Sequence, residues 1–235
     1  MAIFKNSPPI VTDGLVLYLD AANTKSYPTT GTTWNDLVGL NNGTLTNGPT
    51  FSSDNGGSIL CDGVNDYINL GVNYRYQDSF TIECWVKWPN TQTQGSGSAC
   101  GIYGPIFTNK DYGWNLSTDN NNFIMWEVYN TSGAFKQVQT TQSYLNQWVH
   151  IAAYKNGTEI GLYVNGVLIG KNTLTSNSVY YFSNYACTLA GNHPCGPITY
   201  YFLMYAAIAK IYNRALTASE ILQNYNATKQ RFNLT

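Results

Sequence analysis

The sequence predicts an all-β protein, folded as one antiparallel two-sheet sandwich with a short helix near its C-terminal end. Three observations lead to this fold class. Apolar and polar residues alternate over many short segments, Asn-Gly pairs separate some of these segments, and helical spacing of apolar residues is confined to the region around residue 220. A chain of 235 residues can form such a sandwich as a single domain.

The alternating segments define the expected strands. They lie at residues 14–20, 58–61, 66–70, 80–88, 122–129, 148–154 and 159–164. The pairs Asn156-Gly157 and Asn165-Gly166 flank the last of them. Because Asn-Gly accepts the positive φ angles of a type I′ turn, we expect two tight hairpins that join three strands in a meander.

Both ends of the chain carry their own signals. Thr217 and Glu220 have the spacing of a capping box, which predicts a short helix at about residues 217–226. Pro8-Pro9 disfavours helix and predicts an extended arm over residues 1–13, ahead of a domain at residues 14–235. Such an arm is either a disordered tail or a clip onto a neighbouring subunit. The N-terminus lacks the apolar core of a secretory signal.

Composition argues against several classes of protein. Charged residues make up 11% and the net charge is −1, so there is no basic surplus for nucleic-acid binding. A hydrophobic content of 43% argues against disorder, and no apolar run approaches the roughly 18 residues of a membrane span.

The chain has five cysteines, an odd number, so at least one is unpaired within the chain. Cys187 and Cys195, on either side of a short loop, are candidates for a disulfide.

Six segments resemble laminin-G-like domains of the concanavalin A-like lectin/glucanase superfamily, in that family's order. They are Gly14-Leu-Val-Leu-Tyr-Leu-Asp20, Asp62-Gly-Val-Asn-Asp-Tyr-Ile68, Ser79-Phe-Thr-Ile-Glu-Cys-Trp85, Trp148-Val-His-Ile151, Leu162-Tyr-Val-Asn-Gly166 and Ile211-Tyr-Asn-Arg-Ala-Leu216. The first and last are most similar to laminin-G-like domains in tail, fibre and head-surface proteins of marine bacteriophages. The resemblance covers about residues 14–226. It implies a jelly-roll of two curved antiparallel sheets, assembled in bacterial cytoplasm.

The carboxylates and histidines do not predict an enzyme. The Glu-x-Asp-x-Glu pattern of the glucanase branch is absent, and glycoside hydrolysis requires two carboxyl groups facing one another. Glu83, Glu127 and Glu159 fall on separate expected strands, where each is interpreted as a solvated residue. His150 is interpreted as a hydrogen-bonded structural histidine.

Sugar binding on a jelly-roll combines an aromatic ring with amide or carboxylate groups, and two expected strands interleave both. The candidate glycan-binding residues are Trp114, Asn115, Trp126, Tyr129 and Asn130. The alternative is that these rings pack in the sheets, which is the more frequent role of aromatic residues at period two. No cofactor is expected. A structural calcium ion, as in relatives, remains an alternative, but no compact loop of acidic ligands is present.

The segment 202–209 is apolar on both faces. It either packs under the terminal helix and loops or meets another chain. The candidate subunit-contact residues are Pro8, Pro9, Met204, Ala206 and Ile208.

The expected function is that of a non-enzymatic bacteriophage virion protein, a head decoration or tail/fibre subunit. Its expected partners are other virion proteins, further copies of itself and a host surface glycan, with no nucleic acid and no membrane insertion. A carbohydrate-binding adhesin is the alternative, and a glycoside hydrolase is a minor one.

Overall fold

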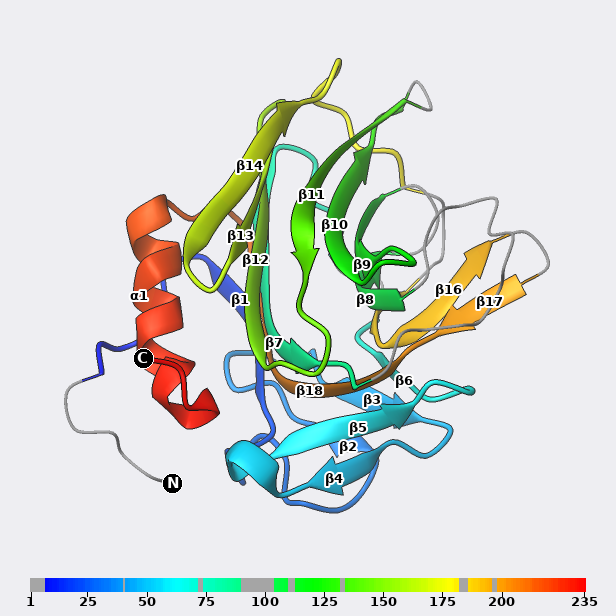
Figure 1. Cartoon of the computed structure of the whole chain (residues 1–235), viewed down its shortest axis with the longest axis vertical. Helices are drawn as coiled ribbons and strands as arrows, with labels where there is room; N and C mark the ends of the chain where they lie inside the picture. The colour runs from blue at the N-terminus through cyan, green and yellow to red at the C-terminus, as the bar shows by residue number, and fades with distance from the viewer. Residues whose placement is uncertain are drawn as a thin grey trace.

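The computed structural model describes residues 7–39, 41–71, 74–89, 104–109, 113–131, 134–181, 186–195 and 198–235, with only the backbone at 192–195, 198 and 199. Within these residues the chain forms two antiparallel sheets that face each other, here called sheet A and sheet B (Figure 1). The predicted fold class, an all-β two-sheet sandwich with one short C-terminal helix, is therefore confirmed.

Sheet A has a long central strand, β7, between β12 and β18. Its strands in spatial order are β14 (Val167–Thr173), β13 (Glu159–Val164), β12 (Val149–Asn156), β7 (Ser79–Lys87), β18 (Leu203–Tyr212), β5 (Ser58–Asp62) and β4 (Thr50–Ser52), and β1 (Leu15–Asp20) also pairs with β18.

Sheet B has β8 and β9 near its middle and β11 at one edge. Its strands in spatial order are β11 (Phe135–Ser143), β10 (Phe123–Tyr129), β9 (Trp114–Thr118), β8 (Gly104–Asn109), β15 (Cys187–Leu189), β6 (Tyr67–Asn69), β3 (Gly43–Thr46) and β2 (Thr33–Trp34). β16 (Gly191–Cys195) and β17 (Ile198–Tyr201) form a separate hairpin beside β8 (Figure 1).

The main core fills the space between the sheets. Phe80 of β7 contacts Trp114 of β9 and Trp126 of β10, with ring centroids 5.8 and 6.0 Å apart. Each of these rings is at most 1% exposed. Alternation along the strands therefore assigns one face of each sheet to this core.

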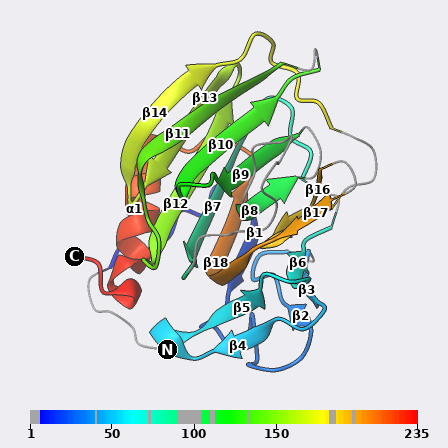
Figure 2. The same ribbon diagram turned by 45° about the vertical axis from the view of Figure 1, so that its right-hand side comes forward.

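The opposite face of sheet A is covered by helix α1 (Ala218–Thr228) and the 3-10 turn η2 (Lys229–Phe232), as Figure 2 also shows. Trp85 of β7 stacks on Phe232 and on Tyr225, with centroid distances of 4.1 and 5.9 Å. Sheet A is thus buried on both faces, which explains why β7 and β18 are buried along nearly their whole length. Among the described residues, no helix combines the length and apolar character that a membrane crossing needs.

The predicted strands are all present, within one or two residues of their expected ends. At Asn165-Gly166 both residues have positive φ, as a type I′ turn requires. The other hairpin differs by one residue, because Asn156 pairs with Glu159 and the turn is centred on Gly157 and Thr158. Several strands were not predicted, since polar or short segments carry little periodic signal. They are β2, β3, β4, β8, β11, β15, β16 and β17.

Candidate functional site

Trp114 and Trp126, the two rings expected to stack on a sugar, lie in the core between the sheets. Trp126 donates a hydrogen bond from Nε1 to the backbone oxygen of Tyr154 in sheet A, at 3.2 Å. Exposed fractions of 1% and 0% leave neither ring accessible to a ligand. Burial therefore contradicts their assignment as glycan-binding residues, and the packing alternative holds for both.

The face of sheet B that points away from sheet A, here called the outer face, carries polar side chains instead. Asn115 alternates with Trp114 and Leu116, and Glu127 alternates with Trp126 and Val128, so both point outward. Glu127 lies directly opposite Asn115 on one side and Gln137 of β11 on the other. These three residues form a continuous polar row across neighbouring strands.

An aromatic pair adjoins this row at the β11 edge. Tyr129 and Phe135 lie opposite each other, two residues beyond Glu127 and Gln137 on the same face. Their rings are stacked with centroids 5.1 Å apart, and Phe135 is 48% exposed. Tyr129 was predicted as a binding residue. Phe135 and Gln137 were missed, although the alternation of residues 135, 137 and 139 against Val138 could have indicated a strand.

Several oxygens of the outer face have unused hydrogen-bonding capacity. Within the described part of the chain, Glu127 Oε2, Asn115 Oδ1 and Ser117 Oγ are buried and have no hydrogen-bond partner. A buried acceptor without a partner costs about 1–3 kcal/mol. These enclosed acceptors would be satisfied by the hydroxyl donors of a ligand that reached them.

Burial also changes the acidity of this face. It raises the pKa of the Glu127 carboxyl to about 7, because the charged form loses contact with water. The prediction that Glu127 is solvated was wrong, since its exposed fraction is 5%. Near neutral pH this side chain therefore exists in both protonation states, and it can donate or accept a hydrogen bond.

Asn130, the last predicted glycan residue, has a structural role at the end of β10. Its Nδ2 donates to Thr175 Oγ1 at 2.7 Å, and its Oδ1 accepts from the backbone nitrogen of Ala134 at 3.1 Å. The side chain thus fixes a turn and the adjacent chain segment. Of the predicted residues, the structure leaves Asn115 and Tyr129 on the outer face.

Under helix α1, sheet A holds a buried charged cluster. Glu83 Oε2 accepts from Lys210 Nζ and from Asn224 Nδ2, both at 2.8 Å, and Glu83 Oε1 lies 3.7 Å from His150 Nε2. Glu83 is fully buried rather than solvated. Burial holds the pKa of His150 well below its usual value, and its ring nitrogens have no hydrogen-bond partner among the described residues. The sequence predicted helix α1 but not this docking position.

The apolar strand β18 packs within the chain. Met204 and Ala206 belong to the core between the sheets, Ile208 packs with Trp85 and Phe232, and none of the three is more than 1% exposed. Their assignment as subunit-contact residues is therefore wrong. The alternative of packing under the terminal helix holds for Ile208, whereas Met204 and Ala206 pack between the two sheets. Pro8 and Pro9 remain exposed. The Pro9 carbonyl accepts from Gln223 of α1 at 2.8 Å, so this part of the arm docks on its own chain.

Cys187 is a free thiol, fully buried in the core. The expected disulfide with Cys195 is therefore not formed, and the Cys195 side chain lies outside the described ones. Burial raises the pKa of the Cys187 thiol well above its usual value, which keeps it protonated. In the described ranges no three His, Cys, Asp or Glu side chains gather as metal ligands.

The fold is that of a lectin-like jelly-roll. A family model described as "Concanavalin A-like lectin/glucanases superfamily" matches residues 62–222, well over half of the chain. The chain therefore belongs to the concanavalin A-like lectin/glucanases superfamily. No curated protein sequence matches it.

Solved structures with the same fold include toxin domains and a sialidase. The binding domain of Paraclostridial Mosquitocidal Protein 1 has a TM-score of 0.69 and 21% identity, over 91% of this chain and 52% of that one. The botulinum neurotoxin serotype D binding domain has a TM-score of 0.67 and 15% identity, over 91% and 51%. Trypanosoma rangeli sialidase has a TM-score of 0.65 and 17% identity, over 97% and 36%. The chain thus spans about half or less of these proteins, and the likeness establishes the fold.

Proposed function

We propose that this domain is a non-enzymatic carbohydrate-recognition domain that binds glycans on the outer face of sheet B. The observation that carries the proposal is the placement of the buried, unpartnered acceptors of Glu127 and Asn115 beside the half-buried Tyr129 ring and the exposed Phe135 ring. A pyranose has an apolar C–H face and a rim of hydroxyl donors. The ring pair suits the first, and the acceptor oxygens suit the second.

The similar solved structures support a recognition role. Two of them are named as binding domains, one of Paraclostridial Mosquitocidal Protein 1 and one of botulinum neurotoxin serotype D. Another is the receptor binding domain of a botulinum neurotoxin C/D mosaic serotype. A recognition domain needs an accessible contact and a few fixed polar groups. Phe135 supplies the first at the edge of the outer face, and the buried side chains of Asn115 and Glu127 supply the second.

The test is a glycan array followed by titration of the best hit. We expect Phe135→Ala and Asn115→Ala each to weaken binding about tenfold, equivalent to one lost contact of about 1.4 kcal/mol. Leu168→Ala is the matched control, because Leu168 is 42% exposed but lies on β14 of sheet A. An array without hits, or equal weakening by Leu168→Ala, would contradict the proposal. Trp114→Ala and Trp126→Ala are unsuitable, since they remove core rings.

Glu127 carries the alternative of glycoside hydrolysis, because a carboxyl group with a pKa near 7 is suited to act as a general acid. That reaction needs a second carboxyl group. Asp119, at the turn after β9, is engaged by the backbone nitrogens of Asn121 and Phe123 and by Gln139. Binding is therefore the function that we favour. Hydrolysis of an array hit that is abolished by Glu127→Gln would reverse this choice.

The virion location also belongs to the proposal and rests on the bacteriophage-like motifs at residues 14–20 and 211–216. The expected host-surface glycan and the expected virion partners are compatible with one another, since a decoration or tail subunit can present a recognition domain. Mass analysis of purified virions tests this part. Hundreds of copies would indicate the head, a few copies the tail, and none would contradict a virion role.

A further inference from the structure

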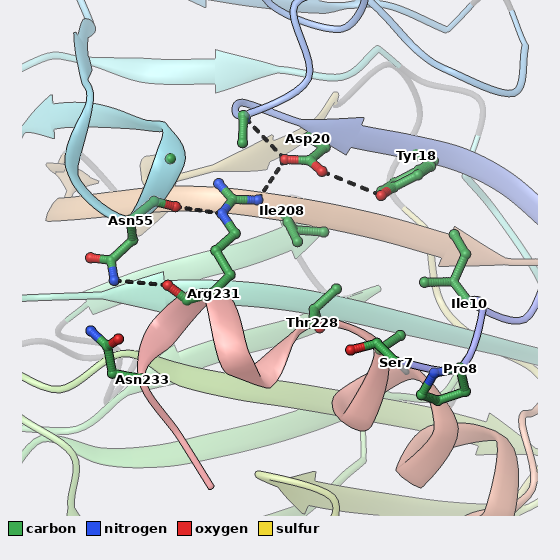
Figure 3. Close-up of a pocket in the computed structure, with 13 residues that line it drawn as sticks. Ser7, Pro8, Ile10, Tyr18, Asp20, Asn55, Ile208, Thr228, Arg231 and Asn233 are labelled. Carbon is green, nitrogen blue, oxygen red and sulfur yellow. Dashed lines mark hydrogen bonds and ion pairs between the residues drawn. The ribbon is translucent and has the colours of Figure 1, made fainter. Parts of the chain in front are cut away.

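A cavity of about 700 Å³ lies on the helix-covered face of sheet A, and Figure 3 shows the residues that line it. The N-terminal arm, β1, the 3-10 turn η1 (Asp54–Gly56), β18 and the C-terminal α1–η2 segment all contribute to its wall. Cavities of about 300–1,000 Å³ are typical of small-molecule sites. No residue of this cavity belongs to the carbohydrate face proposed above.

One end of the cavity is polar and internally neutralised. Arg231 and Asp20 form an ion pair of 2.6 Å, with side-chain exposures of 12% and 8%. Arg231 also donates to the backbone oxygens of Asn55, at 2.6 Å, and of Gly57. Because the two charges cancel and the guanidinium is already held, this end does not favour an anion or a cation as ligand.

The same end of the cavity contains both hydrogen-bond donors and hydrogen-bond acceptors. The Tyr18 hydroxyl lies 3.4 Å from Asp20 Oδ2, and burial raises its pKa above the usual value, so it stays protonated. The side chains of Asn55 and Asn233 line the cavity beside Arg231 (Figure 3). Both asparagines adopt positive φ angles, and the Asn55 amide donates from Nδ2 to the backbone oxygen of Arg231 at 3.0 Å.

The other end of the cavity is mainly apolar. Ile208 lies on the floor, and Pro8 and Ile10 of the arm form the wall farthest from Asn55 (Figure 3). Thr228 Oγ1 already accepts a hydrogen bond from Trp85 Nε1 at 2.8 Å and donates one to the backbone oxygen of Asn224 at 3.0 Å. The cavity is therefore amphipathic, with donors and acceptors at one end and aliphatic carbon at the other.

We propose that this cavity binds a neutral polyhydroxylated ligand of monosaccharide or disaccharide size. Hydroxyl groups both donate and accept, which matches the mixed amide, carboxylate and phenol groups at the polar end. The C–H surface of a sugar ring matches Ile208 and Ile10. The domain then has two recognition sites on opposite sides, and this second site does not depend on the first.

The experiment is ligand-observed saturation-transfer NMR with a panel of glucose, galactose, mannose, lactose and maltose. Ala227 lines the cavity from α1, so Ala227→Trp fills it, whereas Leu222→Trp places the same ring on an exposed position of the same helix. We expect at least one sugar to bind, Ala227→Trp to lose this binding at least tenfold, and Leu222→Trp to retain it. Tyr18→Phe removes only a hydroxyl, so a several-fold loss in this variant tests the site even where Ala227→Trp fails to fold.

The outcomes separate the two sites. No binding by any sugar, or equal binding by wild type, Ala227→Trp and Tyr18→Phe, overturns the cavity proposal. Binding that is lost in Phe135→Ala but kept in both cavity variants also overturns it, while the proposed function of the outer face stands. Loss in the cavity variants alone supports the cavity and leaves the outer face to be judged by the glycan array.

Discussion

Glu127 links the pH of the medium to the stability of the fold. Its pKa is about 7 in the folded chain, against an ordinary value of 4.5. Between these values the folded state binds more protons than the unfolded state. The contribution of Glu127 to the free energy of unfolding is therefore most favourable below pH 4.5, and it decreases as the pH rises to about 7.

Glu127→Gln removes this penalty while it preserves the shape of the side chain. At pH 9 we expect the variant to be more stable than wild type by up to about 3 kcal/mol, and at pH 4 the two should agree. Urea unfolding at both values measures the difference. Glu159→Gln is the control, because Glu159 is 42% exposed and bonds Lys171 at the surface. A pH-independent difference for Glu127→Gln would contradict the assigned pKa.

At the scale of single residues, alternation predicted which side chains of β10 share a face. It did not predict which face meets the core. Trp126 and Glu127 are neighbours in the sequence, and only the packing of sheet B against sheet A decided that the ring is inside and that the carboxyl group is outside.

Among the elements, helix α1 has the clearest local signal. Thr217 and Glu220 form the predicted capping box, and Arg214 NH2 pairs with Glu220 Oε1 at 2.6 Å, which with the cap hydrogen bonds lowers the pKa of Glu220 to about 2. We expect Thr217→Ala to cost about 1 kcal/mol of unfolding free energy, because a backbone N–H loses its acceptor. Thr217→Ser should keep most of the stability in thermal unfolding. Equal loss in both variants would mean that the methyl group, not the cap, matters.

The docking of α1 depends on Asn224, which is fully buried. Its side-chain nitrogen donates hydrogen bonds to Glu83 Oε2 at 2.8 Å and to the Tyr212 hydroxyl at 3.0 Å. Its side-chain oxygen accepts a hydrogen bond from the Val11 backbone nitrogen at 2.8 Å. Asn224→Ala leaves these groups without a partner.

We expect Asn224→Ala to cost roughly 2–4 kcal/mol and to release the N-terminal arm. Limited proteolysis of the arm measures the second effect. Gln223→Ala is the matched control, since Gln223 is the next residue of α1 and makes a single exposed bond to the arm. Arm cleavage that is no faster in Asn224→Ala than in Gln223→Ala would contradict this role.

At the scale of the whole molecule, the burial of β18 predicts that substitutions in this strand change the stability of the fold and not the association of copies of the chain. Met204 is fully buried in the core. We expect Met204→Ala to cost about 2–5 kcal/mol of unfolding free energy, because it leaves a cavity. Light scattering should give the same oligomeric state for folded wild type and variant. A variant with unchanged stability but altered association would restore this strand as a subunit contact.

The sequence by itself determined the fold class, most strands of sheet A, the short C-terminal helix and the family, because periodicity, turn residues and the capping box are local signals. Tertiary structure alone decided where the sites lie. The charged cluster at Glu83 and the cavity at Arg231 each join residues far apart in the chain, and the polar row at Glu127 joins three neighbouring strands. Which face of a strand is buried depends on what packs against it, and no local pattern contains that information.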